Sequence, residues 1–330
     1  MKSVFIILVL YLALFWYGSN IEIPNVIREN NENENSLTFN DNHLSIFNNK
    51  DQKTVDIKCS KATIKANNHY YFKDIRLHFY HTNKTVKTNQ FISDQLNENL
   101  YLNAINGTYN KKKKTFVFEN DVEITLGHST YFKSSKVILI DDKKIMFPSE
   151  IFLQKDGNLF VGEKAEFDLI TNDAIIKENI QCFFKVQNQS IDQKSTQPLL
   201  TELKSSGPLI FNGKTKEIFI YNKTIIENKE LLIECKSAKL ILDENNTLEK
   251  IESIGLVQIK IKKNNIVATA PKAFINLKLN IFTLNESSNR KPYIIINNSK
   301  QTAKYIIYDN NNGTLTAGPT VESIKLNNTK

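Results

Sequence analysis

The chain has 330 residues, which is enough for two domains. Its 10 glycines and 7 prolines are too few for a collagen-like or linker-like chain. The net charge is +8, but Asn, Lys and Ile are abundant throughout, as is typical of AT-rich coding. For that reason the charge alone does not indicate an anionic partner, and the N-x-S/T triplets do not indicate glycosylation.

A continuously apolar run occupies residues 4–18. It is somewhat shorter than the roughly 20 residues that span a bilayer, although neighbouring apolar residues can extend it. The alternative is a cleavable signal peptide, which should end in small residues at alternate positions. This run ends instead in Phe15-Trp16-Tyr17, aromatic residues suited to a membrane interface. We therefore expect an uncleaved transmembrane helix in residues 1–20, with the bulk of the chain outside the cytoplasm.

The rest of the chain shows two long stretches of strand-like alternation. Residues 21–53 are polar and predict a tether. Strand patterns fill residues 54–186, and residues 187–198 form a polar linker that is the best domain boundary. The pattern resumes over residues 199–330, with no long helical periodicity.

Residues 101–125 show the strand pattern most clearly. We expect a short strand, a small-residue turn at Asn106-Gly107-Thr108, a polar tip at 111–114, and then the apolar run Phe116-Val117-Phe118. Glu119-Asn120-Asp121 breaks that run before alternation resumes. Similar units recur at spacings of about 30 residues, which predicts stacking, because one strand pair cannot bury its apolar face alone. An ordinary β-sandwich is the alternative.

No catalytic constellation is visible in the sequence. It has no Gly-rich phosphate loop, no G-x-S-x-G and no H-E-x-x-H. The five histidines show no ligand spacing, and Cys59, Cys182 and Cys235 have no C-x-x-C partner, so we expect no metal, no cofactor and no enzyme activity. The cysteines are expected to be small buried residues. A disulfide between Cys59 and Cys182 is the alternative if the compartment is oxidising.

The main feature left is a large apolar interior. In each strand-like run, every second residue is apolar, so the strand has one apolar face. Two opposed sheets with such faces either pack together or hold a lipid between them. Alternation alone does not separate these two cases. Nucleic-acid binding by interleaved aromatic residues and lysines, as in Tyr70-Tyr71-Phe72-Lys73, is disfavoured by the expected anchor.

The first half of the chain resembles LptC, the inner-membrane component of lipopolysaccharide transport. The resemblance is carried by the apolar run ending in Phe-Trp-Tyr, by residues 56–62 (DIKCSKA), by residues 102–110 (LNAINGTYN) with 118–124 (FENDVEI), and by residues 161–168 (VGEKAEFD). It covers residues 1 to about 186.

The second half resembles LptA, the periplasmic bridge protein with the same OstA-like fold. The matching residues are 205–209 (SSGPL), 211–215 (FNGKT), 235–240 (CKSAKL) and 270–276 (APKAFIN). The chain departs from both families in its load of Asn and Lys and in the scarcity of glycine at the hairpin tips. A fusion of the two components would explain its length.

These resemblances imply an all-β fold, with two open OstA-like β-jellyrolls in series after one transmembrane helix. They imply a single-pass inner-membrane protein, mostly periplasmic, that accepts lipopolysaccharide and passes it along a groove toward the outer membrane. The implied partners are lipopolysaccharide, the inner-membrane ABC transporter of the Lpt system, and the bridge and outer-membrane components, joined by β-edge augmentation. A surface-anchored β-solenoid adhesin or carbohydrate-binding module is the alternative.

If the interior holds lipid, ten residues are candidates for lining it. The alternative role, which is the ordinary one for any single apolar residue, is to fill a dry core. The candidates are Phe116, Phe118, Ile124, Phe167 and Leu169 in the first domain, and Ile233, Leu240, Ile259, Phe274 and Tyr305 in the second. Phe274 has the weakest support, because Ala273 and Ile275 hold the opposite parity.

Overall fold

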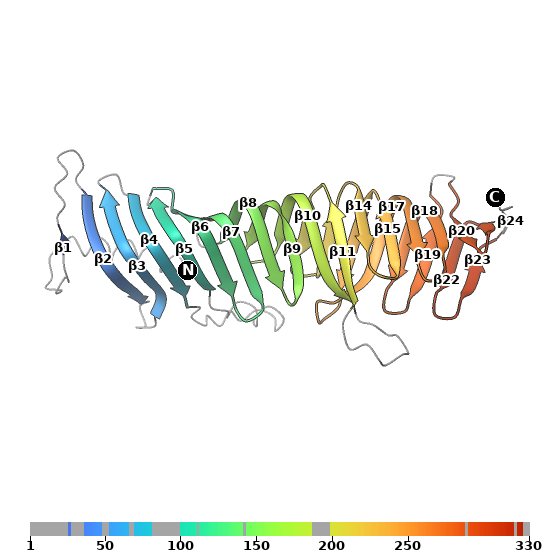
Figure 1. The fold of residues 1–330 in the computed structure, drawn as a ribbon, viewed down its shortest axis with the longest axis horizontal. Helices are drawn as coiled ribbons and strands as arrows, with labels where there is room; N and C mark the ends of the chain where they lie inside the picture. The colour runs from blue at the N-terminus through green and yellow to red at the C-terminus, as the bar shows by residue number, and fades with distance from the viewer. Residues whose placement is uncertain are drawn as a thin grey trace. The chain divides into compact units, whose positions relative to one another are not determined.

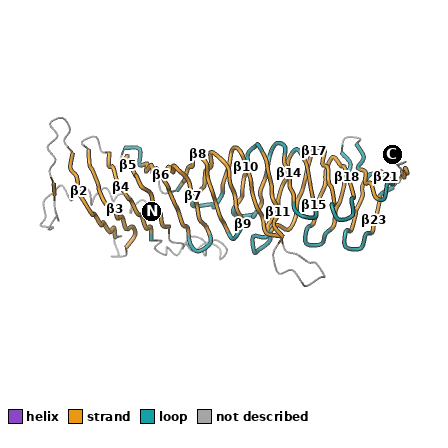
Figure 2. Tube along the Cα trace, viewed as in Figure 1, coloured by secondary structure: helices purple, strands orange, loops and turns teal. Residues whose placement is uncertain are grey.

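The structure is a computed structural model, and every element in its described part is a β-strand (Figure 2). It describes residues 26–27, 36–47, 53–65, 69–80, 100–110, 112–140, 143–186, 199–287, 290–319 and 322–325. The all-β prediction is thus confirmed for these residues, while the expected helix in residues 1–20 lies outside them. The chain divides into two compact units, residues 1–153 and 154–330.

The first unit is an antiparallel meander (Figure 1). Each strand from β1 to β6 pairs with the next one in the chain. The strands are β1 (Val26–Ile27), β2 (Ser36–Phe47), β3 (Lys53–Lys65), β4 (His69–Phe79), β5 (Leu100–Asn110), β6 (Thr115–Leu126), β7 (Thr130–Ile140) and β8 (Lys144–Lys155). β2 falls in the stretch expected to be a tether, yet it pairs with β3 along its length.

Each long strand of this unit bends at an irregular point near its middle, which we call the corner. The spacing of buried positions jumps there, by three residues in β5 (Ala104 to Gly107) and by four in β6 (Phe118 to Val122). The same alternation of three and four follows in β7 and β8. The pairing registers of β5 with β6 and of β6 with β7 shift at these points. These are β-bulges, which bend the strand and increase its local twist.

The corner explains two segments, 119–121 and 106–108, that were predicted from the sequence to interrupt the strands. Asn120 and Asp121 in β6 have φ angles of 64° and 54°, a left-handed conformation that Asn and Asp tolerate better than most residues. The predicted break at 119–121 is therefore a bulge inside one strand. The predicted turn at 106–108 was wrong, because β5 runs through it and pairs with both β4 and β6 there.

The second unit begins with the long hairpin of β9 and β10 and continues with mostly shorter strands. They are β9 (Asn158–Asp168), β10 (Ala174–Val186), β11 (Leu199–Ser205), β12 (Leu209–Asn212), β13 (Glu217–Ile220), β14 (Thr224–Glu227), β15 (Leu231–Cys235), β16 (Ser237–Leu242), β17 (Leu248–Ile261), β18 (Ile266–Asn276), β19 (Ile281–Asn285), β20 (Tyr293–Ile296), β21 (Ser299–Thr302), β22 (Tyr305–Asp309), β23 (Thr314–Ala317) and β24 (Glu322–Lys325). Turns separate many of them, including those predicted at 156–157, 212–213, 263–265 and 311–313.

These strands form two antiparallel ladders. One runs from the second half of β10 through β11, β14, β15, the second half of β17, the first half of β18, β20 and β21 to β24. The other runs from the first half of β10 through β12, β13, β16, the first half of β17, the second half of β18, β19 and β22 to β23. The long strands β10, β17 and β18 cross the corner and so belong to both ladders.

The inner faces of the two ladders cover each other. Leu203 and Ile233 on one ladder and Ile218 and Leu240 on the other are all fully buried. A lone sheet would leave both faces in water, so burial this complete requires the two apolar faces to pack together. Every pairing between the described strands whose register is defined is antiparallel, unlike the ladders of a parallel β-helix.

The expected domain boundary at 187–198 differs from the division at 153–154. Strands β10 and β11 flank those polar residues and pair with each other, with Val186 opposite Leu199. The stretch 187–198 therefore connects two neighbouring strands of the second unit, and its polar composition marks a connection rather than a break between compact units.

Gly107 offers a test of the corner in the first unit. A Cβ atom there would lie 3.2 Å from Cγ2 of Ile75 and 3.4 Å from Cδ1 of Phe118. We expect Gly107→Val to lower stability by about 1–3 kcal/mol through overpacking, read as a lower urea midpoint of unfolding. Thr108→Val, at the next and more exposed position, is the control and should change stability by less than about 0.5 kcal/mol. Equal midpoints for the two variants would contradict this packing.

Candidate functional site

The candidate site is the apolar interior of each unit. Seven of the ten candidate residues are buried there. They are Phe116, Phe118 and Ile124 in the first unit and Phe167, Ile233, Leu240 and Ile259 in the second. Phe167 had been assigned to the first domain, but it belongs to the second unit, on β9.

Three candidates do not point inward, and for them the predicted parity was wrong. Leu169 lies in the turn after β9 and is only half-buried. Phe274 is half-buried because the buried positions of β18 jump from Ala270 to Ala273 at the corner, which turns Phe274 outward. Tyr305 opens β22 and is 39% exposed, while Ile306 and Tyr308 are buried. Since Tyr305 to Tyr308 are all apolar or aromatic, alternation could not select the inward pair.

The interior of the first unit also contains aromatic rings that the sequence did not single out. Tyr109 stacks on Phe116 with ring centroids 4.3 Å apart, and Phe116 stacks on Phe118 at 5.8 Å. Phe132 on β7 stacks on Phe147 on β8 at 5.5 Å. Tyr109, Phe132 and Phe147 all lie in runs where apolar and polar residues alternate. They could have been predicted by assigning the inward-facing positions separately on each side of the corner.

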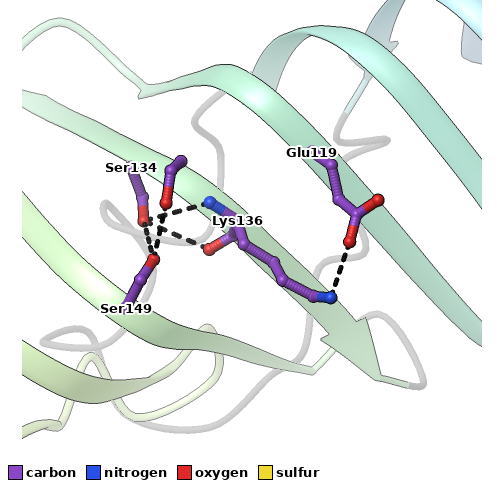
Figure 3. A network of polar contacts seen from close by, with 5 residues as sticks. Glu119, Ser134, Lys136 and Ser149 are labelled. Carbon is purple, nitrogen blue, oxygen red and sulfur yellow. Dashed lines mark hydrogen bonds and ion pairs between the residues drawn. The ribbon is translucent and has the colours of Figure 1, made fainter.

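In β6, β7 and β8 polar side chains contact one another at the corner. Lys136 forms an ion pair of 2.6 Å with Glu119 (Figure 3). Ser134 donates a 2.7 Å hydrogen bond to the backbone carbonyl of Glu150. Ser134 also lies 3.3 Å from Ser149, which joins β7 to β8 (Figure 3). These contacts satisfy polar groups where the ladder is irregular. Apolar side chains are exposed at other corners, among them Ile105 on β5 and Leu256 on β17.

Further ion pairs lie at the bulge of β6 and at the bulge of β10. Lys133 contacts Asp121 at 2.8 Å and Glu123 at 3.1 Å, and its hydrogen bonds to these carboxylates raise the pKa of Lys133. In the second unit Lys164 pairs with Glu178 at 2.7 Å beside the bulge of β10. These pairs are exposed, so they help to align neighbouring strands but add little stability individually.

The described residues contain no group of three or more His, Cys, Asp or Glu that could hold a metal ion. The three cysteines are free and buried. Burial raises the pKa of the Cys59 and Cys235 thiols to about 11 and raises the pKa of Cys182 as well. Such thiols stay protonated and are poor nucleophiles.

A cavity of about 300 Å³ in the second unit lies apart from the candidate residues. It is lined by Lys223, Glu234, Cys235, Lys236, Gly255, Leu256 and Gln258. Most of these side chains are at least partly exposed, and Leu256 is 62% exposed. This cavity therefore opens at the outer corner and is not part of the apolar interior.

Within the ranges that the structure covers, no helix is long and apolar enough to cross a membrane. The expected anchor falls outside those ranges.

The candidate site is thus the inner face of antiparallel ladders that bend at a corner. The model of the lipopolysaccharide-assembly, LptC-related family matches residues 4–182, more than half of the chain. The chain belongs to this family, and the predicted resemblance of its first half is confirmed.

Comparison with solved structures finds the crystal structure of LptH, the LptA-homologous periplasmic component of the conserved lipopolysaccharide transport device from Pseudomonas aeruginosa. The sequence identity is 14% and the TM-score is 0.34. The match covers 38% of this chain and 93% of that chain. No curated protein matches the chain.

The buried thiols provide a test of the closed interior. In the folded protein at pH 8, Cys59, Cys182 and Cys235 should resist iodoacetamide, because burial blocks access and keeps them protonated. They should react after denaturation in urea, as measured by mass spectrometry. A Lys260→Cys variant, with its thiol on an exposed strand position, is the control and should be alkylated without urea. Alkylation of Cys182 as fast as this control would show that the interior is open.

Proposed function

We propose that this chain is a membrane-anchored periplasmic lipid-transfer protein that accepts lipopolysaccharide extracted from the inner membrane and passes it along the interior of open β-jellyrolls toward the outer membrane. Membership of the LptC-related family places the chain in lipopolysaccharide assembly. The proposal adds the anchor at residues 1–20, the jellyroll form of both units, an LptA-like role for the second half and the path of the lipid.

The observation that carries the proposal is the apolar interior, which is bordered by aliphatic and aromatic side chains on both ladders. Taking one CH₂ group from water is worth about 0.8 kcal/mol. A carrier of several acyl chains therefore needs a long apolar surface that water does not reach. In the second unit such side chains occur from Phe184 on β10 to Tyr308 on β22.

The interior must open for acyl chains to enter, because its side chains now cover one another. The corner provides a place for this motion. In β17 it consists of Gly255 and Leu256, both at positive φ, where the ladder register shifts between Ile254 and Val257. Bending there would separate the two ladders without breaking the hydrogen bonds inside either one, so the corner would act as a hinge.

The ends of the ladders support the proposed partners. Strand β23 pairs with β22, and β24 pairs with β21, so within the described residues the two ladders end on these short strands. Exposed edge strands accept further strands by β-augmentation. We propose that the chain joins the Lpt bridge and outer-membrane components in this way, and that the inner-membrane ABC transporter of the Lpt system delivers lipopolysaccharide to the first unit.

Site-specific photo-crosslinking tests the path of the lipid. A photoreactive amino acid placed singly at Phe118, Phe167, Ile233 or Ile259 should form lipopolysaccharide adducts, because these side chains lie on the inner faces. The matched controls are the next residues, Glu119, Glu166, Glu234 and Lys260, whose side chains lie on the opposite side of the same strands. We expect adducts at the inner positions and none at the controls.

Equal labelling of both sets, or no adduct in either unit, would contradict the proposed path. Adducts confined to the first unit would limit lipid binding to the part that matches the LptC-related family and remove the proposed role of the second half.

A further inference from the structure

Four cations cluster on the outer side of β3 and β4, two on each side of the corner. Lys58 lies directly opposite Arg76, and Lys61 lies directly opposite Lys73. All four side chains are exposed. We call this set of Lys58, Lys61, Lys73 and Arg76 the basic corner.

Like charges directly opposite each other on neighbouring strands are destabilising, and elsewhere the fold neutralises them. Glu163 lies opposite Glu178, but Lys164 contacts Glu178 at 2.7 Å and the Asn179 amide donates to Glu163 at 2.8 Å. Glu202 lies opposite Glu227, and these carboxylates pair with Lys204 at 2.8 Å and with Lys262 at 2.6 Å. An uncompensated pair is therefore unusual in this molecule.

The basic corner has no such compensation within the described residues. No carboxylate there forms an ion pair with any of its four cations. Asp74, the nearest acid in the chain, accepts a 2.7 Å hydrogen bond from Ser60. Asp56 accepts hydrogen bonds from Ser45 and Tyr80 and lies 3.5 Å from His43. Two cation pairs thus face solvent at an energetic cost that an external anion would remove.

We propose that the basic corner docks on the anionic phospholipid surface of the membrane that holds the chain. The inference rests on the proposed anchor. Residues 19–25 separate the apolar run from β1, which pairs with β2 beside β3. These seven residues reach at most about 25 Å, so this end of the first unit lies within reach of the bilayer. Lysines and arginines near an anionic leaflet are attracted to it.

A neighbouring aromatic residue favours a lipid surface over an acidic protein. Tyr71 lies two residues before Lys73 on β4 and is 40% exposed, and the Lys65 ammonium lies 5.4 Å from its ring centroid. Tyrosine beside cations is typical of the membrane–water interface, where the ring contacts acyl chains and its hydroxyl stays wet. Docking would hold the first unit against the leaflet from which lipopolysaccharide is taken.

The test uses the full chain with a fluorophore on Asn103→Cys, an exposed position opposite Arg76. The protein is combined with vesicles of phosphatidylcholine alone or mixed with phosphatidylglycerol, each carrying a spin-labelled lipid as quencher. The test variant is Lys61→Gln/Lys73→Gln. The control is Lys260→Gln/Lys263→Gln, which removes the same charge from exposed positions in the second unit.

We expect quenching with phosphatidylglycerol, little quenching without it, and loss of quenching at high salt. Each removed cation should lower the ratio of docked to undocked protein about five-fold, from about 1 kcal/mol per charge. The test variant should therefore lose docking while the control retains it. Because the substitutions relieve repulsion, the urea midpoint of the test variant should not fall.

Quenching that is independent of phosphatidylglycerol, or equal in the test and control variants, would overturn the proposal. If residues 1–20 are not an anchor, the result is different, because the chain will not float with phosphatidylcholine vesicles. Docking by the basic corner then predicts that the chain floats with vesicles containing phosphatidylglycerol, that high salt prevents this flotation, and that the test variant does not float. Absence of flotation with phosphatidylglycerol vesicles would overturn docking too.

Discussion

The structure depends on one constraint, which is that the apolar face of each long strand has to be covered. No helix lies against these sheets in the described residues. The strands meet the constraint by bending at a bulge, so that one half of a strand carries one inner face and the other half carries the opposing face. Fully buried residues on both sides of the bend, such as Ser253 and Val257 of β17, reflect this arrangement. The polar outer contacts and the division into two ladders both follow from the bend.

The sequence predicted much of the fold because alternation reports which residues share a face. The all-β class, the hairpin of β5 and β6, many turns and seven inward side chains followed from it. What it missed lies at the corner, where an extra residue changes the parity. Phe274 turned outward for this reason. β2 was taken for a tether because residues 21–53 are polar overall, and the apolar residues of β2 change parity around Asp41, at φ 49°. Register is a non-local property that one strand does not determine.

Two ideas about function meet at the corner. Its inner side would be the hinge through which an apolar interior opens for acyl chains. Its outer side in β3 and β4 carries a cluster of cations that forms no ion pair within the described residues. The net charge of the whole chain did not indicate an anionic partner, because coding bias explains it equally well. The pairing register is more informative, because it shows that Lys58 faces Arg76 and Lys61 faces Lys73, and it is these pairs that motivate the proposed anionic surface.

The central claim is that the ladders separate to admit lipid, and a distance measurement tests it most directly. Lys263 and Lys278 are exposed at turns that mark the two far tips of the β17–β18 hairpin, on opposite sides of its corner. Spin labels on a Lys263→Cys/Lys278→Cys variant, with the native thiols buried, would report the separation by pulsed electron paramagnetic resonance. The account predicts that lipopolysaccharide shifts the distance distribution to longer values. An unchanged distribution, with lipopolysaccharide shown to be bound, would contradict it.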